Sequence, residues 1–169
     1  AALALRVLSP AKERAAREAL RDAALACAPR AELAPPATGF YAAEAAVFVD
    51  ARGVGALYHS EAGFAAALAA RAERLGLPAM VAIADTRGTA LIAARRLARS
   101  EPQASGAQHG SLGAVQVIPP GGDSAFLAPL ALDLLNPDDA LADALSRFGL
   151  RRVGDLLRTP ERALVNRLG

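Results

Sequence analysis

Two carboxylates flank a short apolar run in the first third of the chain. Glu44 precedes Val47-Phe48-Val49, and Asp50 follows it directly. A run of three β-favouring residues bounded by turn residues predicts a buried central strand. Strand ends often carry the carboxylates that bind Mg²⁺ and support phosphoryl transfer. The pattern therefore suggests a metal site with Glu44 and Asp50 as ligands.

Arginines gather near the C-terminal end, around a predicted helix–hairpin–helix. The segment 145–157 places Gly149 between two helical stretches. Such a turn can aim backbone N–H groups at a phosphate, and arginine side chains add bidentate phosphate contacts. The alternative is a tight helical hairpin whose arginines are simply solvated. The residues predicted to contact DNA are Arg147, Arg151, Arg152 and Arg158.

Other residues with reactive side chains lack partners at a suitable spacing. His59 lies at a predicted turn, and His109 lies in a polar stretch with no second ligand at metal-binding distance in sequence. Cys27 is the single cysteine and follows alanines at helical spacing, which is typical of a small buried residue. The sequence predicts no catalytic residue, no metal site and no cofactor from this group.

The elements that position these residues alternate between helix and strand up to about residue 123. Afterwards the pattern is all-helical, so the predicted fold class is α+β, with domains at 1–123 and 124–169. The third helix is predicted to point Arg95, Arg96 and Arg99 outwards. Leu75 is predicted to face inwards from the second helix, and Asn136 to cap a C-terminal one. The expected elements are a helix after Ser9-Pro10, strands 31–34 and 47–49 as an antiparallel hairpin, a helix from Ser60, a strand at 80–84, a helix from Asp85 or Thr86, a strand at 114–118, and helices after Pro137, near Val153 and after Pro160.

Length and composition bound the function only loosely. The chain has 169 residues, enough for one ordinary domain with a core that needs no disulfides. Its formal net charge of +2 does not by itself indicate a nucleic-acid binder. A single cysteine fits a reducing compartment, and no apolar run approaches the length of a membrane span. We therefore expect a cytoplasmic protein without a membrane partner.

Three collinear segments resemble the Y-family (DinB/UmuC-type) translesion DNA polymerases. Residues 47–53 (Val-Phe-Val-Asp-Ala-Arg-Gly) and residues 82–90 are similar to two palm segments of that family, and residues 145–157 are similar to its thumb. The resemblance implies a partial palm, an antiparallel sheet with helices on one face, that lacks the family's first strand and its fingers. A small all-α helix–hairpin–helix thumb would follow the palm.

The chain departs from the family where the family's chemistry takes place. Active members carry a Ser-x-Asp-Glu motif before the strand, and its Asp and Glu positions here are Ala45 and Ala46. A methyl group cannot ligate Mg²⁺. A lysine that contacts the triphosphate is replaced by Leu91, and the Gly-Ile-Gly phosphate hairpin by residues 134–137 (Leu-Leu-Asn-Pro). The resemblance thus implies that Asp50 has a structural role and that the chain is not an enzyme.

The resemblance implies a non-catalytic, polymerase-like scaffold for bacterial translesion synthesis and DNA-damage-induced mutagenesis. By that likeness its partners would be weakly bound DNA, a replicative-type error-prone polymerase, a RecA-like companion protein and the sliding clamp. One alternative is an active polymerase that uses displaced carboxylates, Glu44 and Asp50. Another is a protein-interaction platform with little affinity for DNA, which the modest net charge of +2 favours.

Overall fold

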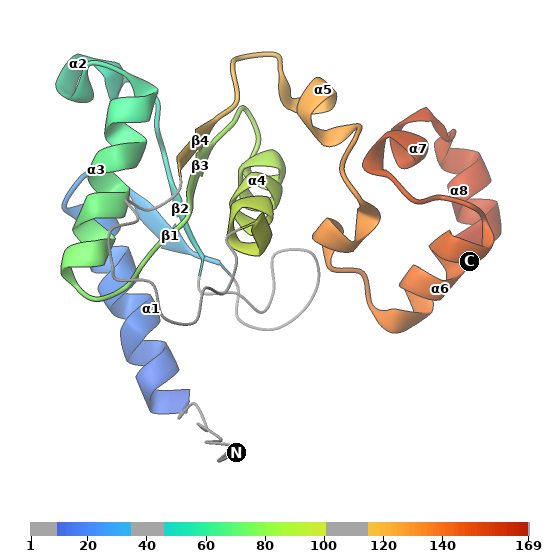
Figure 1. The fold of residues 1–169 in the computed structure, drawn as a ribbon, viewed down its shortest axis with the longest axis horizontal. Coiled ribbons are helices and arrows are strands. Elements are labelled where there is room, and N and C mark those ends of the chain that lie inside the picture. Colours follow the sequence, from blue (N-terminus) through green and yellow to red (C-terminus); the bar gives the residue numbers. More distant parts are fainter. Residues whose placement is uncertain (1–9, 35–45, 101–114, 169) are drawn as a thin grey trace.

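Helices and strands alternate through the first two thirds of the chain in the computed structural model (Figure 1), which describes residues 10–34, 46–100 and 115–168. The predicted α+β class is confirmed. The elements are α1 (Pro10–Leu25), β1 (Ala31–Leu33), β2 (Val47–Val49), α2 (Gly55–Tyr58), α3 (Glu61–Arg74), β3 (Val81–Ile83), α4 (Arg87–Ser100), β4 (Val115–Val117), α5 (Asp123–Leu127), the 3-10 helix η1 (Leu132–Leu135), α6 (Asp139–Arg147), α7 (Val153–Arg158) and α8 (Glu161–Leu168).

The local signals for α1 and α3 are confirmed at both helices. Helix α1 begins at Pro10, as the proline predicts. Ser60 caps α3 by accepting a hydrogen bond from the Gly63 N–H at 2.9 Å. Leu75 was predicted to face inwards but is half exposed, because α3 ends at Arg74 and the chain turns away there. The buried face of α3 consists of Phe64, Ala65, Ala69 and Ala72.

The strands form two small sheets. β1 and β2 pair antiparallel with Ala31 opposite Val49, which confirms the predicted hairpin. β3 and β4 pair parallel with Val81 opposite Val115, so the prediction of a wholly antiparallel sheet is wrong. The reason is that α4 lies between β3 and β4 in the chain, and a helical crossover brings the second strand back in the same direction.

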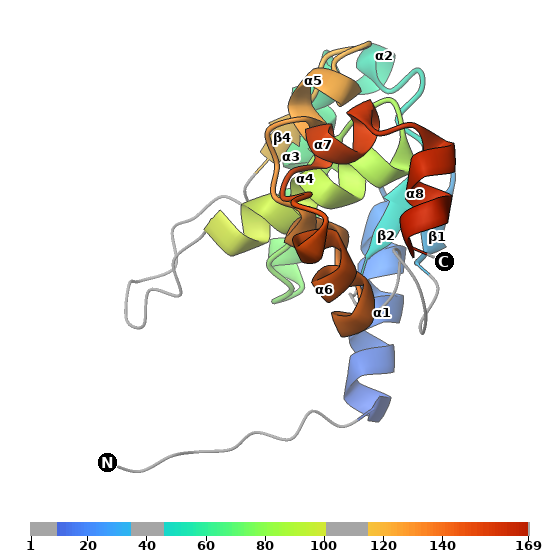
Figure 2. The same ribbon diagram turned by 90° about the vertical axis from the view of Figure 1, so that its right-hand side faces the viewer.

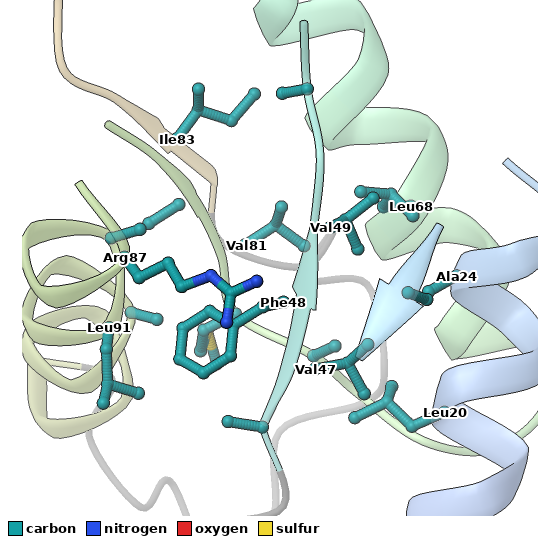
Figure 3. Close-up of a pocket in the computed structure, with 18 of the residues that line it drawn as sticks. Leu20, Ala24, Val47, Phe48, Val49, Leu68, Val81, Ile83, Arg87 and Leu91 are labelled. Atoms are coloured by element: carbon teal, nitrogen blue, oxygen red, sulfur yellow. The ribbon is translucent and has the colours of Figure 1, made fainter. Parts of the chain in front are cut away.

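Helices cover both faces of the strands, and the prediction of helices on one face is also wrong. α1 packs against β1 and β2, and α3 packs against β3 and β4. α4 packs on β3 and β4 from the opposite side (Figure 1). Alternation along β2 shows the two faces directly: Val47 and Val49 point toward Leu20 and Leu68, whereas Phe48 points toward α4 (Figure 3).

Arg95 lies in the interior, although it was predicted to face outwards with Arg96 and Arg99. Its residue is only 4% exposed, and its Nη1 donates to the carbonyl O of Leu134 at 3.2 Å. The helical pattern of α4 alone does not reveal this, because η1 comes from a later part of the chain and covers that side of the helix. Arg96 and Arg99 are exposed as predicted.

The C-terminal helices lie together at one end of the molecule, in front of α4 in the turned view (Figure 2). Their core is the cluster of Leu132, Leu145 and Val153. Asp138, and not Asn136, caps α6 by accepting from the Leu141 N–H at 2.8 Å. Asn136 adopts a left-handed φ of 54° and ends η1. The short link 136–138 therefore both ends η1 and begins α6.

Within the residues that the structure describes, no helix combines the length and apolar character that crossing a bilayer requires.

Candidate nucleic-acid interface

Asp50, at the end of β2, is closed onto Arg52. The Asp50 carboxylate accepts from the Arg52 side chain, with Nη2 at 2.6 Å from Oδ2 and Nε at 3.0 Å from Oδ1. It also accepts from the Arg52 backbone N–H at 3.0 Å. The pKa of Asp50 lies far below the usual range of an aspartate. The largest cause is the hydrogen bonding from the Arg52 side chain, and the next is the hydrogen bond from the Arg52 backbone N–H. Asp50 therefore stabilises the turn after β2.

Close to Asp50, the residues that the structure describes offer no side-chain ligand for the predicted metal ion. Ala46 contributes a backbone carbonyl that accepts from the Ala34 N–H at 2.9 Å, and its side chain is a methyl group. Glu44 and Ala45 lie outside the described residues. Among residues 10–34, 46–100 and 115–168, no group of three or more His, Cys, Asp or Glu side chains is placed to hold a metal ion. His59 is exposed at the end of α2, and His109 is outside the described range.

A cavity of about 1450 Å³ lies between β2 and β3. Most of its walls are apolar side chains, with Val47 and Val49 on one side of β2 and Phe48 on the other (Figure 3). Arg87 lies over the Phe48 ring, 5.3 Å from its centre, and forms an ion pair with Glu32 at 2.7 Å. Several arginines also line it, and Arg52, Arg87 and Arg99 among them form ion pairs with carboxylates. Apolar walls with paired cations suit an apolar polypeptide segment better than a polyphosphate.

Leu91, which the resemblance to Y-family polymerases places at a triphosphate-binding lysine position, faces the interior. It is 5% exposed and belongs to the buried side of α4. A leucine that contributes to the core has no means of neutralising phosphate charge.

Two loops interlock at the carboxyl ends of β3 and β4. The Asp123 carboxylate accepts from the backbone N–H groups of Asp85 and Thr86, at 3.2 and 3.1 Å, and from the Thr86 hydroxyl at 2.9 Å. In return the Gly121 N–H donates to Asp85 at 2.6 Å. Burial acts to raise the pKa of Asp123, but the hydroxyls of Thr89 and Thr86 and these amides outweigh it and lower the pKa.

The predicted local cap of α4 is confirmed, because the Thr86 hydroxyl accepts from the Thr89 N–H at 3.2 Å; the part that Asp123 plays beside it was not predicted. The available signal was the pair of glycines before it, since Gly121 adopts a φ of 76° and turns the chain back toward β3. A carboxylate that reaches the start of a helix from a distant segment cannot be found from helix-start patterns alone.

We call α6, α7 and α8 the C-terminal unit. The four arginines predicted to contact DNA are all exposed there. Arg147 ends α6, Arg151 and Arg152 form the link to α7, and Arg158 ends α7. Three of these arginines, Arg151, Arg152 and Arg158, donate to the same carboxylate. The Asp155 side chain accepts from the backbone N–H of Arg151 at 3.1 Å, from that of Arg152 at 2.9 Å, and from Arg158 Nη2 at 2.8 Å.

The backbone amides of this hairpin bond within the protein, so of the two alternatives that the sequence left open the structure favours the tight helical hairpin over amides aimed at a phosphate. The Val153 N–H donates to the Leu130 carbonyl and the Gly154 N–H to the Ala128 carbonyl, at 2.9 and 3.0 Å. Asp155 takes the two preceding amides. The physical reason is that a carboxylate in the first turn of a helix satisfies its orphan N–H groups, which leaves only side chains for an external anion.

Acidification is expected to weaken the C-terminal unit through Asp155. The amides of Arg152 and Arg151 are the main cause that lowers the pKa of Asp155 from its ordinary value of 3.8. A group whose pKa is lower in the folded state stabilises the fold above its unfolded pKa, and this contribution disappears as the pH falls through the folded pKa. We expect Asp155→Asn to reduce the loss of thermal stability between about pH 5 and pH 2.

Thermal unfolding followed by circular dichroism across that range measures this effect. Asp143→Asn, at an exposed site of α6, is the matched control. Equal pH dependence in the two variants would contradict the assigned role of Asp155.

Comparison with known proteins finds a clear relative. The chain is 34% identical over 160 residues to Protein ImuB of Caulobacter vibrioides, in strain NA1000/CB15N and equally in strain ATCC 19089/CB 15. The match covers 95% of this chain but 30% of each relative, so the chain spans less than a third of their length. No family model matches the chain, and no solved structure matches it.

Proposed function

Since the chain is ImuB-like over 95% of its length, we propose that it is part of a non-catalytic, polymerase-like scaffold for bacterial translesion synthesis. The protein would support DNA-damage-induced mutagenesis while a partner polymerase carries out the chemistry. The observation that carries this proposal is the lack of a usable carboxylate at β2 among the described residues, where Ala46 has a methyl group and Asp50 is bonded to Arg52.

Two-metal phosphoryl transfer needs carboxylates that are free to bridge both ions. Asp50 would have to give up the Arg52 guanidinium and the Arg52 amide before it could ligate Mg²⁺. The buried Leu91 removes a cation that the resemblance to Y-family polymerases assigns to the incoming nucleotide. These features support a scaffold over an active polymerase with displaced carboxylates.

We propose that residues 1–123 are a palm-like domain without the first strand and fingers, and residues 124–169 a thumb-like domain. Two strand edges that pair with no other described strand support the first part. Among the described strands β2 pairs with β1 and β3 pairs with β4, while β2 and β3 line the same cavity. Their apolar residues are all half-buried, whereas a strand inside a continuous sheet would be buried. A strand between them would complete one sheet.

DNA contact, on this proposal, uses arginine side chains only. The amides of the hairpin are already bonded, so Arg147, Arg151, Arg152 and Arg158 would supply the phosphate contacts. Arg158 shares its charge with Asp155, which weakens its field toward an external phosphate. The binding should therefore be weak and dominated by counterion release.

The proposed partners are a replicative-type error-prone polymerase, a RecA-like companion protein and the sliding clamp. We infer these partners from the resemblance to ImuB-type proteins. The apolar cavity and the modest net charge of +2 also suit a protein-interaction platform, which is the second candidate function.

Primer extension tests the absence of catalysis. We expect the full-length protein with Mg²⁺, a primed template and all four dNTPs to extend no primer above the protein-free background. Extension that disappears in Asp50→Ala or Glu44→Ala would show an active polymerase with displaced carboxylates and overturn the scaffold proposal.

Salt-titrated binding to a short DNA duplex separates the scaffold from a pure interaction platform. We expect Arg151→Ala combined with Arg152→Ala to reduce the slope of log affinity against log salt by about 1–2, since each lost phosphate contact removes about one unit. The control combines Arg71→Ala with Arg74→Ala on the exposed side of α3. No measurable binding at low salt, or equal slopes for all three proteins, would favour the interaction platform.

A further inference from the structure

The chain between the two parts of the molecule runs beside α4 and is bonded to it at both ends. We call residues 121–135 the strap; it includes α5 and η1. In Figure 1 it passes from the top of α4 down toward its C-terminal half. Its first residues are held by the interlock in which Asp123 accepts from the amides of Asp85 and Thr86, just before α4.

Three successive arginine contacts hold the rest of the strap against α4. Arg96 lies 5.7 Å from the centre of the Phe126 ring. Arg99 Nη1 forms an ion pair with Asp133 at 2.7 Å, and its Nη2 donates to the Asp133 carbonyl O at 3.2 Å. Arg95 donates to the next carbonyl, that of Leu134.

Arg95 and Arg99 are four residues apart, which places them on the same face of the helix. They meet two carbonyls near the end of η1, those of Asp133 and Leu134, and the Asp133 carbonyl also accepts from the Asn136 N–H at 3.1 Å. Arg95 is 4% exposed, and a buried guanidinium is tolerated only where it is well bonded. Its burial therefore depends on the strap remaining in place.

The other side of the strap carries the C-terminal helices. Val153 and Gly154 donate their amides to the carbonyls of Leu130 and Ala128, and the Leu132 amide donates to the Arg151 carbonyl at 3.1 Å. Leu132 also belongs to the core cluster of this unit. One segment is thus bonded to α4 on one side and to the start of α7 on the other.

We propose that the strap, through Arg95 and Arg99, holds the C-terminal helices in one fixed position relative to the α/β part. Arg95 is then a positioning residue for the whole C-terminal unit. This proposal does not depend on DNA binding or on the absence of catalysis.

Distances between paired spin labels test the proposal in the full chain. One label is placed at Arg74→Cys on α3 and the other at Ser146→Cys on α6, with Cys27→Ala to remove the native thiol; both label sites are exposed. We expect a narrow distribution in this background. Arg95→Met with Arg99→Met should make it about twofold wider, because the C-terminal unit then opens locally.

Arg71→Met, an exposed site on α3, is the matched control and should leave the width unchanged. Where Arg95→Met lowers the folded population, Arg99→Met with Asp133→Ala tests the same idea at exposed positions, and a wider distribution is again expected. An unchanged width in the folded double variants, or equal widening in the Arg71→Met control, would overturn the proposal.

Discussion

Phe64→Ala is expected to destabilise the α/β part by about 3–5 kcal/mol. Phe64 is 1% exposed and forms the core cluster with Ala28 and Val54. Its ring lies 5.1 Å from that of Tyr58. The other buried residues on its face of α3 are alanines, and partly buried side chains such as Leu68 and Ile83 pack around the ring; removing the ring therefore takes away the largest side chain of this cluster and leaves a cavity.

A loss of that size is a large share of the total stability of a typical domain, about 5–15 kcal/mol. Urea denaturation followed by circular dichroism would show it as a lower midpoint. Leu57→Ala is the matched control, because Leu57 is 79% exposed on α2 and should change stability by less than about 0.5 kcal/mol. Similar midpoints for the two variants would show that the assigned core is wrong.

Gly154→Ala is expected to destabilise the C-terminal unit by about 1–3 kcal/mol, the usual cost of overpacking. A Cβ atom at this position would lie 2.8 Å from the Ala128 carbonyl O and 3.2 Å from the Ala128 Cβ. Relieving that clash would lengthen the hydrogen bond from Gly154 to Ala128 and separate α7 from the strap. The better helix propensity of alanine, worth about 1 kcal/mol, opposes the effect but does not cancel it.

Gly149→Asn provides the comparison at a glycine of a different kind. Gly149 has a φ of 72° and open space around its Cα, and asparagine tolerates the left-handed region. We expect it to cost less than about 1 kcal/mol. If urea denaturation found Gly154→Ala to be at least as stable as the parent, the close approach of α7 to Ala128 would be refuted.

Local patterns were sufficient wherever the determining contacts are local. Pro10, Ser60 and the antiparallel β1–β2 pair were all predicted, because helix starts depend on neighbouring residues and strands that follow one another in the chain tend to pair. The parallel pairing of β3 and β4 was not, since strand direction depends on how α4 crosses over.

The site was less predictable than the fold, because its charges are paired across long stretches of sequence. The sequence pattern predicts that Arg95 lies on the exposed face of an amphipathic helix. In the structure η1 covers it, and its acceptor Leu134 lies 39 residues later in the chain. Asp123 binds the Thr86 amide just before α4 from 37 residues downstream. The four C-terminal arginines could be located from sequence, whereas the use of their amides by Asp155 required the three-dimensional arrangement.

The strap also has a consequence for how the protein exchanges hydrogen with solvent. The amides of Val153 and Gly154 belong to a short helix, yet their acceptors, Leu130 and Ala128, lie on the strap. Fraying of α7 at its C-terminal end does not release them; they become free only when the whole helix leaves the strap. In heavy water these two amides should therefore be among the slowest to exchange in the C-terminal unit. Their protection would report the free energy of separating α7 from the strap.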